Sequence, residues 1–267
     1  MSSGFSVTQA LWAAVSFVPR AWQGAWLVLG LMLVATVGLS FFAMSHQLKL
    51  ISLLIVLLLF LLKLVAQGAL YRIALFGRDA RAEGLGFGGL QFGWPELRLL
   101  WATVVVSLFV LMIVATVGIV FAIAFSMSGL ASGYEDSMAA LIALVKRHSG
   151  ADYVFIGYLA FAGLYLIFLS LKLVLVPVAN IGGRKLVTLN ALGLTTGYVG
   201  RLFLGLAALV VPFLLIAGGV AHTLPLKGNG GILVHMALLL LDIFGLFPLI
   251  VGFLTSAYRQ IMAIRSK

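Results

Sequence analysis

The sequence contains no cysteine and very little charge. Without cysteine the protein has no disulfides, thiolate metal sites or cysteine nucleophiles. Only 9% of the 267 residues are charged and 63% are hydrophobic, whereas a soluble domain carries about 25% charged residues. The chain lacks the polar surface that would coat a soluble globule, so the lipid bilayer must serve as its solvent.

The sequence also lacks the short segments of alternating apolar and polar residues that build a membrane β-barrel. Its apolar residues come in unbroken runs instead. We therefore predict an all-α fold, a polytopic integral membrane helical bundle that forms a single transmembrane domain over residues 1–267. The apolar runs predict six transmembrane helices, at about 26–44, 50–71, 99–125, 153–176, 202–221 and 232–257.

Two shorter segments predict helices that lie on the membrane. Residues 6–18 place apolar side chains at helical spacing, are too short to span a bilayer, and should end at Pro19, so an interfacial helix is expected; a disordered tail is the alternative. The start of the chain lacks the basic residues of a signal peptide, so we expect it to be retained. Residues 132–148 begin with a capping box, Ser132 and Glu135, and predict a periplasmic amphipathic helix.

Acidic residues are scarce, seven against 17 Lys and Arg, and the net charge is +10. Six spans put both termini on one side of the membrane. The termini and the two long connectors, 72–98 and 172–201, hold twelve basic residues, whereas the opposite connectors hold four. The positive-inside rule then predicts a multi-pass protein of the bacterial inner (plasma) membrane with both termini cytoplasmic. Because topology explains the charge, we expect no nucleic-acid partner.

The second connector carries a family resemblance. Its incoming helix ends in Pro177-Val178-Ala179, and a glycine turn with Arg184, a short helix, Leu194-Thr195-Thr196-Gly197 and Arg201 follow. This pattern resembles the six-helix membrane domain that is fused to some bacterial glycerophosphodiester phosphodiesterases and also occurs alone in uncharacterised bacterial membrane proteins. Trp12, Trp22 and the segment Gln67–Arg72 are similar too. The resemblance implies a membrane module without the phosphodiesterase domain, and it implies no activity.

Two ionisable residues, Lys63 and Asp242, fall within predicted spans. At about 1.5 Å per residue both lie near the middle of the bilayer, where charged side chains are costly and face the bundle interior. We predict that they pair, or that they share a polar pocket with Gln67. The pair would serve as a proton or ion relay or as a polar substrate site. Alternatively it fixes helix register, or Lys63 extends towards the interface.

The remaining basic residues and the histidines suggest weaker sites. We expect one cytoplasmic basic face. It either sets the topology and contacts anionic lipids in general, or forms a specific site for a lipid phosphate or a protein partner. It comprises Arg72, Arg78, Arg81, Arg184, Lys185 and Arg201. The four histidines map to the opposite side but lack the spacing of a helical ligand pair, so they are only weak metal candidates: His46, His148, His222 and His235. No metal or cofactor is predicted.

No catalytic motif is present. The sequence has no HExxH and no GxSxG, and six of the seven acidic residues lie in connectors. The sequence therefore favours a non-enzymatic scaffold or accessory module that contacts membrane lipids, anionic head groups among them, or a partner membrane protein. A small transporter or channel using Lys63 and Asp242 is the alternative, and a lipid-modifying enzyme ranks last. The connectors 72–98 and 172–201 each join two predicted spans and are both long and basic, so an internal repeat of two-helix units is an alternative that the sequence does not decide.

Overall fold

The computed structural model describes residues 4–43, 49–127, 150–223 and 229–266. Within these ranges the chain forms helices and no strand. Six helical stretches are long and apolar enough to cross a membrane. The predicted all-α bundle with six potential spans is confirmed. The predicted helix at 132–148 lies outside the described residues.

The long helices extend beyond the predicted spans at most of their ends. They are α1 (Val7–Ala43), α2 (Lys49–Phe76), α3 (Trp94–Met127), α5 (Gly150–Leu173), α7 (Val199–Thr223) and α8 (Asn229–Leu240), which continues through a π-helical turn, η4 (Leu241–Leu246), into α9 (Phe247–Arg265). Short helical turns occupy the two long connectors: η1 (Gly77–Arg81), η2 (Phe87–Gly89), α6 (Val176–Gly182) and η3 (Leu189–Gly193).

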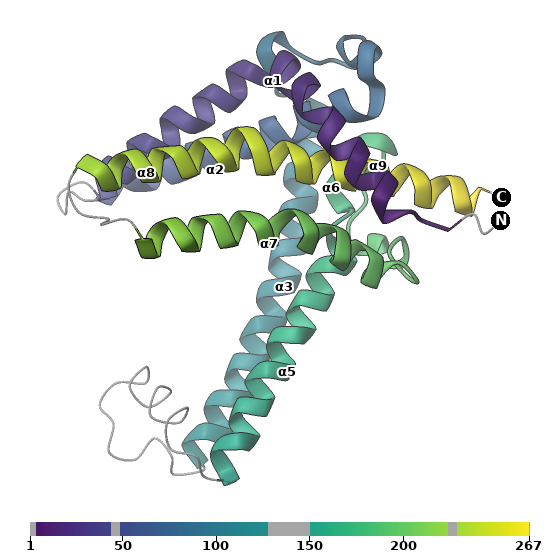
Figure 1. The fold of residues 1–267 in the computed structure, drawn as a ribbon. Coiled ribbons are helices and arrows are strands. Elements are labelled where there is room, and N and C mark those ends of the chain that lie inside the picture. The colour runs from purple at the N-terminus through teal and green to yellow at the C-terminus, as the bar shows by residue number, and fades with distance from the viewer. Residues whose placement is uncertain (1–3, 44–48, 128–149, 224–228, 267) are drawn as a thin grey trace.

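The helices form two groups. α1, α2, α7 and the α8–α9 helix pack together, while α3 and α5 form a hairpin that diverges from them (Figure 1). The two hairpin helices lie side by side, because Tyr158 stacks on Phe121 and donates a hydrogen bond of 2.9 Å to the Val117 carbonyl. The start of the described chain lies against α9, since the Ser6 amide donates to Gln260 at 2.8 Å. We call this the terminal end of the molecule.

Helix α1 differs from the prediction. A helix was expected to end at Pro19, but α1 runs through this residue and bends at Ala25 instead (φ −125°, ψ 18°). Proline removes one backbone hydrogen bond, and the packing around it holds the helix together: Ala10, Ala14 and Ala21 are fully buried. The arm before the bend packs against α9 and leaves Trp12 75% exposed. Its interfacial placement stays a prediction.

The bend in α1 is covered by the glycine-rich first connector. Gly88 and Gly89 have φ of 59° and 84°, a left-handed conformation that favours glycine. A side chain on Gly88 would collide with Leu27, and a Cβ on Gly89 would lie 3.0 Å from the Ala25 Cα. The connector is therefore a tightly packed cap on the bend of α1.

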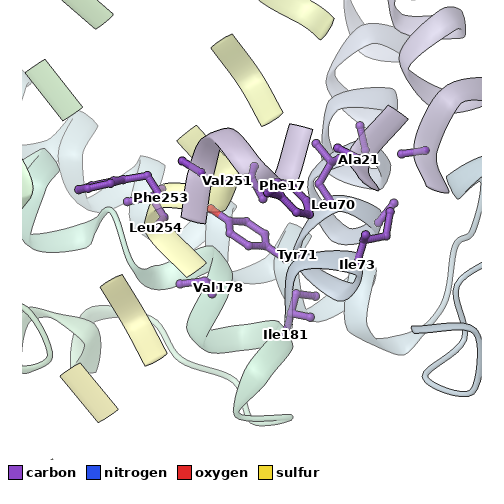
Figure 2. Packing of buried hydrophobic residues seen from close by; sticks show 14 of the residues in the cluster. Phe17, Ala21, Leu70, Tyr71, Ile73, Val178, Ile181, Val251, Phe253 and Leu254 are labelled. Atoms are coloured by element: carbon purple, nitrogen blue, oxygen red, sulfur yellow. The ribbon is translucent and has the colours of Figure 1, made fainter. Parts of the chain in front are cut away.

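The hydrophobic core lies where α1, α2, α6 and α9 meet. Figure 2 shows Phe17 of α1 and Tyr71 of α2 close together at its centre, with Val178 of α6 and Leu254 of α9 around them. A smaller cluster at the root of the hairpin includes Ala102, Leu169 and Leu173. Beyond this root, no residue of 103–123, all of which the structure describes, is buried. The described part of the hairpin is thus buried at its base, and its side chains at 103–123 are half-buried or exposed.

Candidate functional site

Lys63 and Asp242 line the same cavity. It has a volume of about 380 Å³ and lies between α1, α2 and the η4 region, with Thr36, Phe247 and Ile250 also in its walls. The two side chains interact electrostatically, although in the described part of the chain they form no direct ion pair. The structure thus brings the two predicted residues together with space between them.

The π-helical turn at Asp242 is held in place by α1. Within η4 the Phe247 amide donates to the Asp242 carbonyl, five residues back. Pro248 has no N–H to give to the Phe244 carbonyl four residues earlier. Trp22 satisfies that carbonyl with its indole N–H at 2.7 Å. The distortion is therefore a stabilised feature, and such turns are frequent at functional sites.

A polar contact lies further along the same helices. The Ser40 hydroxyl of α1 lies 3.3 Å from the His235 Nε2 of α8. Among the described residues, no group of three potential His, Cys, Asp or Glu ligands comes together. His46 and His148 lie outside the described residues, and the side chain of His222 is not described either.

Gln67 is not in the Lys63 cavity. It lies one helical turn along α2, in an adjoining cavity of about 340 Å³, and hydrogen-bonds to Tyr71. Phe247 and Ile250 line both cavities and so form the wall between them. The predicted pocket therefore contains Lys63 and Asp242, and Gln67 faces its neighbour.

Arg72 does not belong to an exposed basic face. Its guanidinium lies 2.8 Å from the Glu96 carboxylate, and the two side chains are only 4% and 1% exposed. Glu96 also accepts hydrogen bonds from the Gly93 amide at 2.9 Å and from Gln91 at 3.3 Å. A Cβ on Gly68 would lie 2.8 Å from the same carboxylate. This buried pair fastens the first connector and the start of α3 onto α2.

Arg184 and Arg201 also serve contacts within the protein. Arg184 forms an ion pair with Glu83, and its carbonyl accepts a hydrogen bond from Arg98, which joins the two long connectors. Arg201 donates to the Phe5 carbonyl at 2.9 Å. Lys185 is exposed. Of the predicted basic face, Arg78, Arg81 and Lys185 remain as exposed cations without an internal partner in the part of the chain that the structure describes.

Arg78 and Arg81 line a third cavity together with Arg20, which was not among the predicted site residues. The cavity has a volume of about 640 Å³ and lies between α1, the end of α2 and η1; Gln23, Gly24, Ile73 and Leu85 complete its walls. No acidic residue is among the described residues that line it. Arg20 is the sole Asp, Glu, Lys or Arg in residues 1–48, and this isolated charge is the signal in the sequence that marks it.

Comparison with known proteins gives no relatives: no protein family, no curated protein and no solved structure matches this chain. The chemistry of each cavity therefore has to be derived from its own residues. Such places within the described ranges include the Lys63–Asp242 cavity, the adjoining Gln67 cavity and the cavity with three arginines.

Proposed function

We propose that this chain is a non-enzymatic integral membrane protein, a scaffold or accessory module that contacts lipids, including anionic head groups, and a partner membrane protein. The observation that carries this proposal is the α3–α5 hairpin, whose described residues are buried at its root and which diverges from the other helices beyond it (Figure 1). Large apolar side chains are exposed along both of its helices, among them Leu111 and Leu164 at 62% and 66%.

Such a hairpin needs an apolar environment over most of its length. Lipid chains supply one, and a helix of another membrane protein supplies one with better packing. The hydrophobic effect does not drive helix association inside a bilayer, so a partner would be selected by the shape of the hairpin surface. An apolar hairpin that diverges from the other helices suits a module that positions other membrane components.

The charge distribution supports a placement in the bacterial inner membrane with the terminal end in the cytoplasm. The exposed cations Arg78, Arg81 and Lys185 all belong to connectors that the positive-inside rule assigns to that side. The resemblance to the membrane domain of glycerophosphodiester phosphodiesterases agrees with a module of this kind. The buried Arg72–Glu96 pair has a structural role, because it fastens the first connector and the start of α3 onto α2.

Photo-crosslinking in native membranes tests the scaffold role. A photoreactive residue at Leu111 or Leu164 should give adducts with one discrete protein. The same residue at Leu70, which is fully buried, should give adducts within the chain only. Lipid adducts alone at both hairpin positions would contradict the scaffold and leave a lipid-embedded protein without a partner.

Transport is the second candidate, and the Lys63–Asp242 cavity favours it. An oppositely charged pair with space between its members can hold water or a small polar solute. Because the chain has no cysteine, Thr36→Cys introduces a single thiol into the cavity wall. Transport requires this thiol to react with a membrane-impermeant reagent from one side of sealed vesicles. If it is as unreactive as Leu29→Cys, whose parent residue is fully buried, transport through this cavity is excluded.

A further inference from the structure

The cavity with three arginines is unusual among the charged groups of this protein. Of the nine arginines that the structure describes, six donate to a carboxylate or a backbone carbonyl: Arg72, Arg98, Arg184, Arg201, Arg259 and Arg265. The other three have no such partner in the described part of the chain, and all three line one cavity: Arg20, Arg78 and Arg81. We call it the arginine pocket.

The fold holds these three side chains near one another. Arg78 and Arg81 are three residues apart in a 3₁₀-helix, η1, where positions i and i+3 lie on the same side. Ala80 is 2% exposed and anchors η1 to the protein, and the Leu85 amide donates to the Ala80 carbonyl at 3.0 Å. Arg20 comes from the arm of α1 before its bend. The site is therefore assembled from two segments that are about sixty residues apart in the sequence.

Electrostatics favours an anion in this pocket. Three guanidinium groups around one cavity repel one another, and no carboxylate among the described lining residues offsets them. Guanidinium presents a planar fork of N–H donors that matches phosphate oxygens in a bidentate manner. Gln23 adds a side-chain amide to the same wall. A phosphate group would relieve the repulsion and accept several charge-assisted hydrogen bonds at once.

The surroundings favour a lipid as the source of that phosphate. Trp22 and Trp26 follow Arg20 on α1 and are 47% and 50% exposed; tryptophan is enriched at the level of the lipid head groups. Apolar side chains of Ile73 and Leu85 share the lining with the arginines. A volume of about 640 Å³ lies in the usual range of ligand sites, about 300–1,000 Å³, and accommodates a head group and the start of its acyl chains.

We infer that the arginine pocket binds the phosphate of an anionic lipid head group, with a terminal phosphate monoester preferred. A monoester carries up to two negative charges and three free oxygens, which suits three guanidinium groups better than the single charge of a phosphodiester. This inference rests on the proposed lipid-contacting function and names the lipid chemistry that the module recognises.

The test uses the full chain in uncharged detergent micelles. Dioctanoyl phosphatidic acid is titrated against it by calorimetry, with dioctanoyl phosphatidylcholine and inorganic phosphate as comparison ligands. We expect saturable binding of phosphatidic acid and at least tenfold weaker binding of the other two ligands. Arg81→Gln or Arg78→Gln should weaken the binding of phosphatidic acid by about ten- to a hundredfold, since each removes hydrogen bonds between charged groups.

The matched control is Lys185→Gln, which removes one positive charge from an exposed connector residue that does not line the pocket. It should bind phosphatidic acid as the unmodified chain does. An equal loss of affinity for phosphatidic acid in Lys185→Gln would mean that the net charge of the protein, and not the pocket, determines binding, and would overturn the site. The absence of saturable binding would overturn it as well. If inorganic phosphate binds as tightly as phosphatidic acid, the lipid source is wrong.

The arginine side chains of the pocket are exposed, so their substitution should leave the protein folded. Comparing the thermal unfolding of each variant with that of the unmodified chain checks this directly. Failure of the inference is also separable from failure of the proposed function. If phosphatidic acid does not bind while the hairpin crosslinks to a discrete protein, the pocket is refuted and the accessory module remains.

Discussion

Glu96→Gln should lower the free energy of unfolding more than any other conservative substitution in the first connector. Glutamine keeps the shape of the side chain but removes the charge that balances Arg72, and both side chains are almost fully buried, at 1% and 4% exposure. Removing one partner of a buried ion pair leaves an uncompensated charge and costs about 3–5 kcal/mol. Gly93 and Gln91 donate to different oxygens of the Glu96 carboxylate, and glutamine keeps only one oxygen, so one of these hydrogen bonds is lost as well. We expect a loss in this range.

The assay is unfolding of the purified protein in mixed micelles with increasing denaturing detergent. Glu83→Gln is the matched control, because it breaks the other direct ion pair of the described chain, between Glu83 and Arg184, whose side chains are 29% and 67% exposed. Solvent screens such a pair, so its loss should cost no more than about 1 kcal/mol. If Glu96→Gln is no more destabilising than Glu83→Gln, the buried pair does not hold the connector.

A double-variant cycle separates the ion pair from simple packing. Arg72→Met combined with Glu96→Met replaces both charges by apolar side chains, a change that is often neutral for a buried pair. The double variant should therefore be more stable than either single variant, with a coupling energy of about 0.5–3 kcal/mol. Additive losses would mean that the two residues act independently.

Three further changes test neighbouring features of the fold. Gly68→Ala places a Cβ 2.8 Å from the Glu96 carboxylate and should lower the free energy of unfolding by about 1–3 kcal/mol; an unchanged unfolding midpoint would contradict the close approach. Trp22→Phe removes the hydrogen bond to the π-helical turn and should cost about 1–3 kcal/mol, whereas a neutral result would mean that the turn needs no support from α1. Lys63→Met leaves Asp242 without a countercharge in its cavity and should reduce the folded yield in membranes; adding Asp242→Asn should restore it, and a double variant as poor as the single one would argue against electrostatic balance.

The spans were predictable because apolar length alone decides whether a helix can cross a bilayer. The bend in α1 was not. A local rule placed a break at Pro19, but the break lies at Ala25, where Gly88 and Gly89 of a distant connector pack against the helix. That contact is tertiary and leaves no local trace in the sequence of α1.

The candidate sites were also predictable only where the sequence pattern of single helices decides them, and not where tertiary contacts do. Counting residues along two helices placed Lys63 and Asp242 at a common depth, and they line one cavity. Counting charges along the sequence could not distinguish the buried Arg72 from the exposed arginines near it. Arg72 is buried because it pairs with Glu96, which is 24 residues further along the chain. Arg20 was missed as a site residue because it meets Arg78 and Arg81 only when the arm of α1 folds beside η1.

The most direct test of lipid recognition is native mass spectrometry of the protein released gently from its own membrane. If the arginine pocket holds a lipid phosphate, the unmodified chain should retain a single anionic, phosphate-bearing lipid. The triple variant Arg20→Gln, Arg78→Gln, Arg81→Gln should lose this lipid and keep its overall fold. Equal retention by both proteins, or a retained lipid that is zwitterionic, would contradict a phosphate site in this pocket.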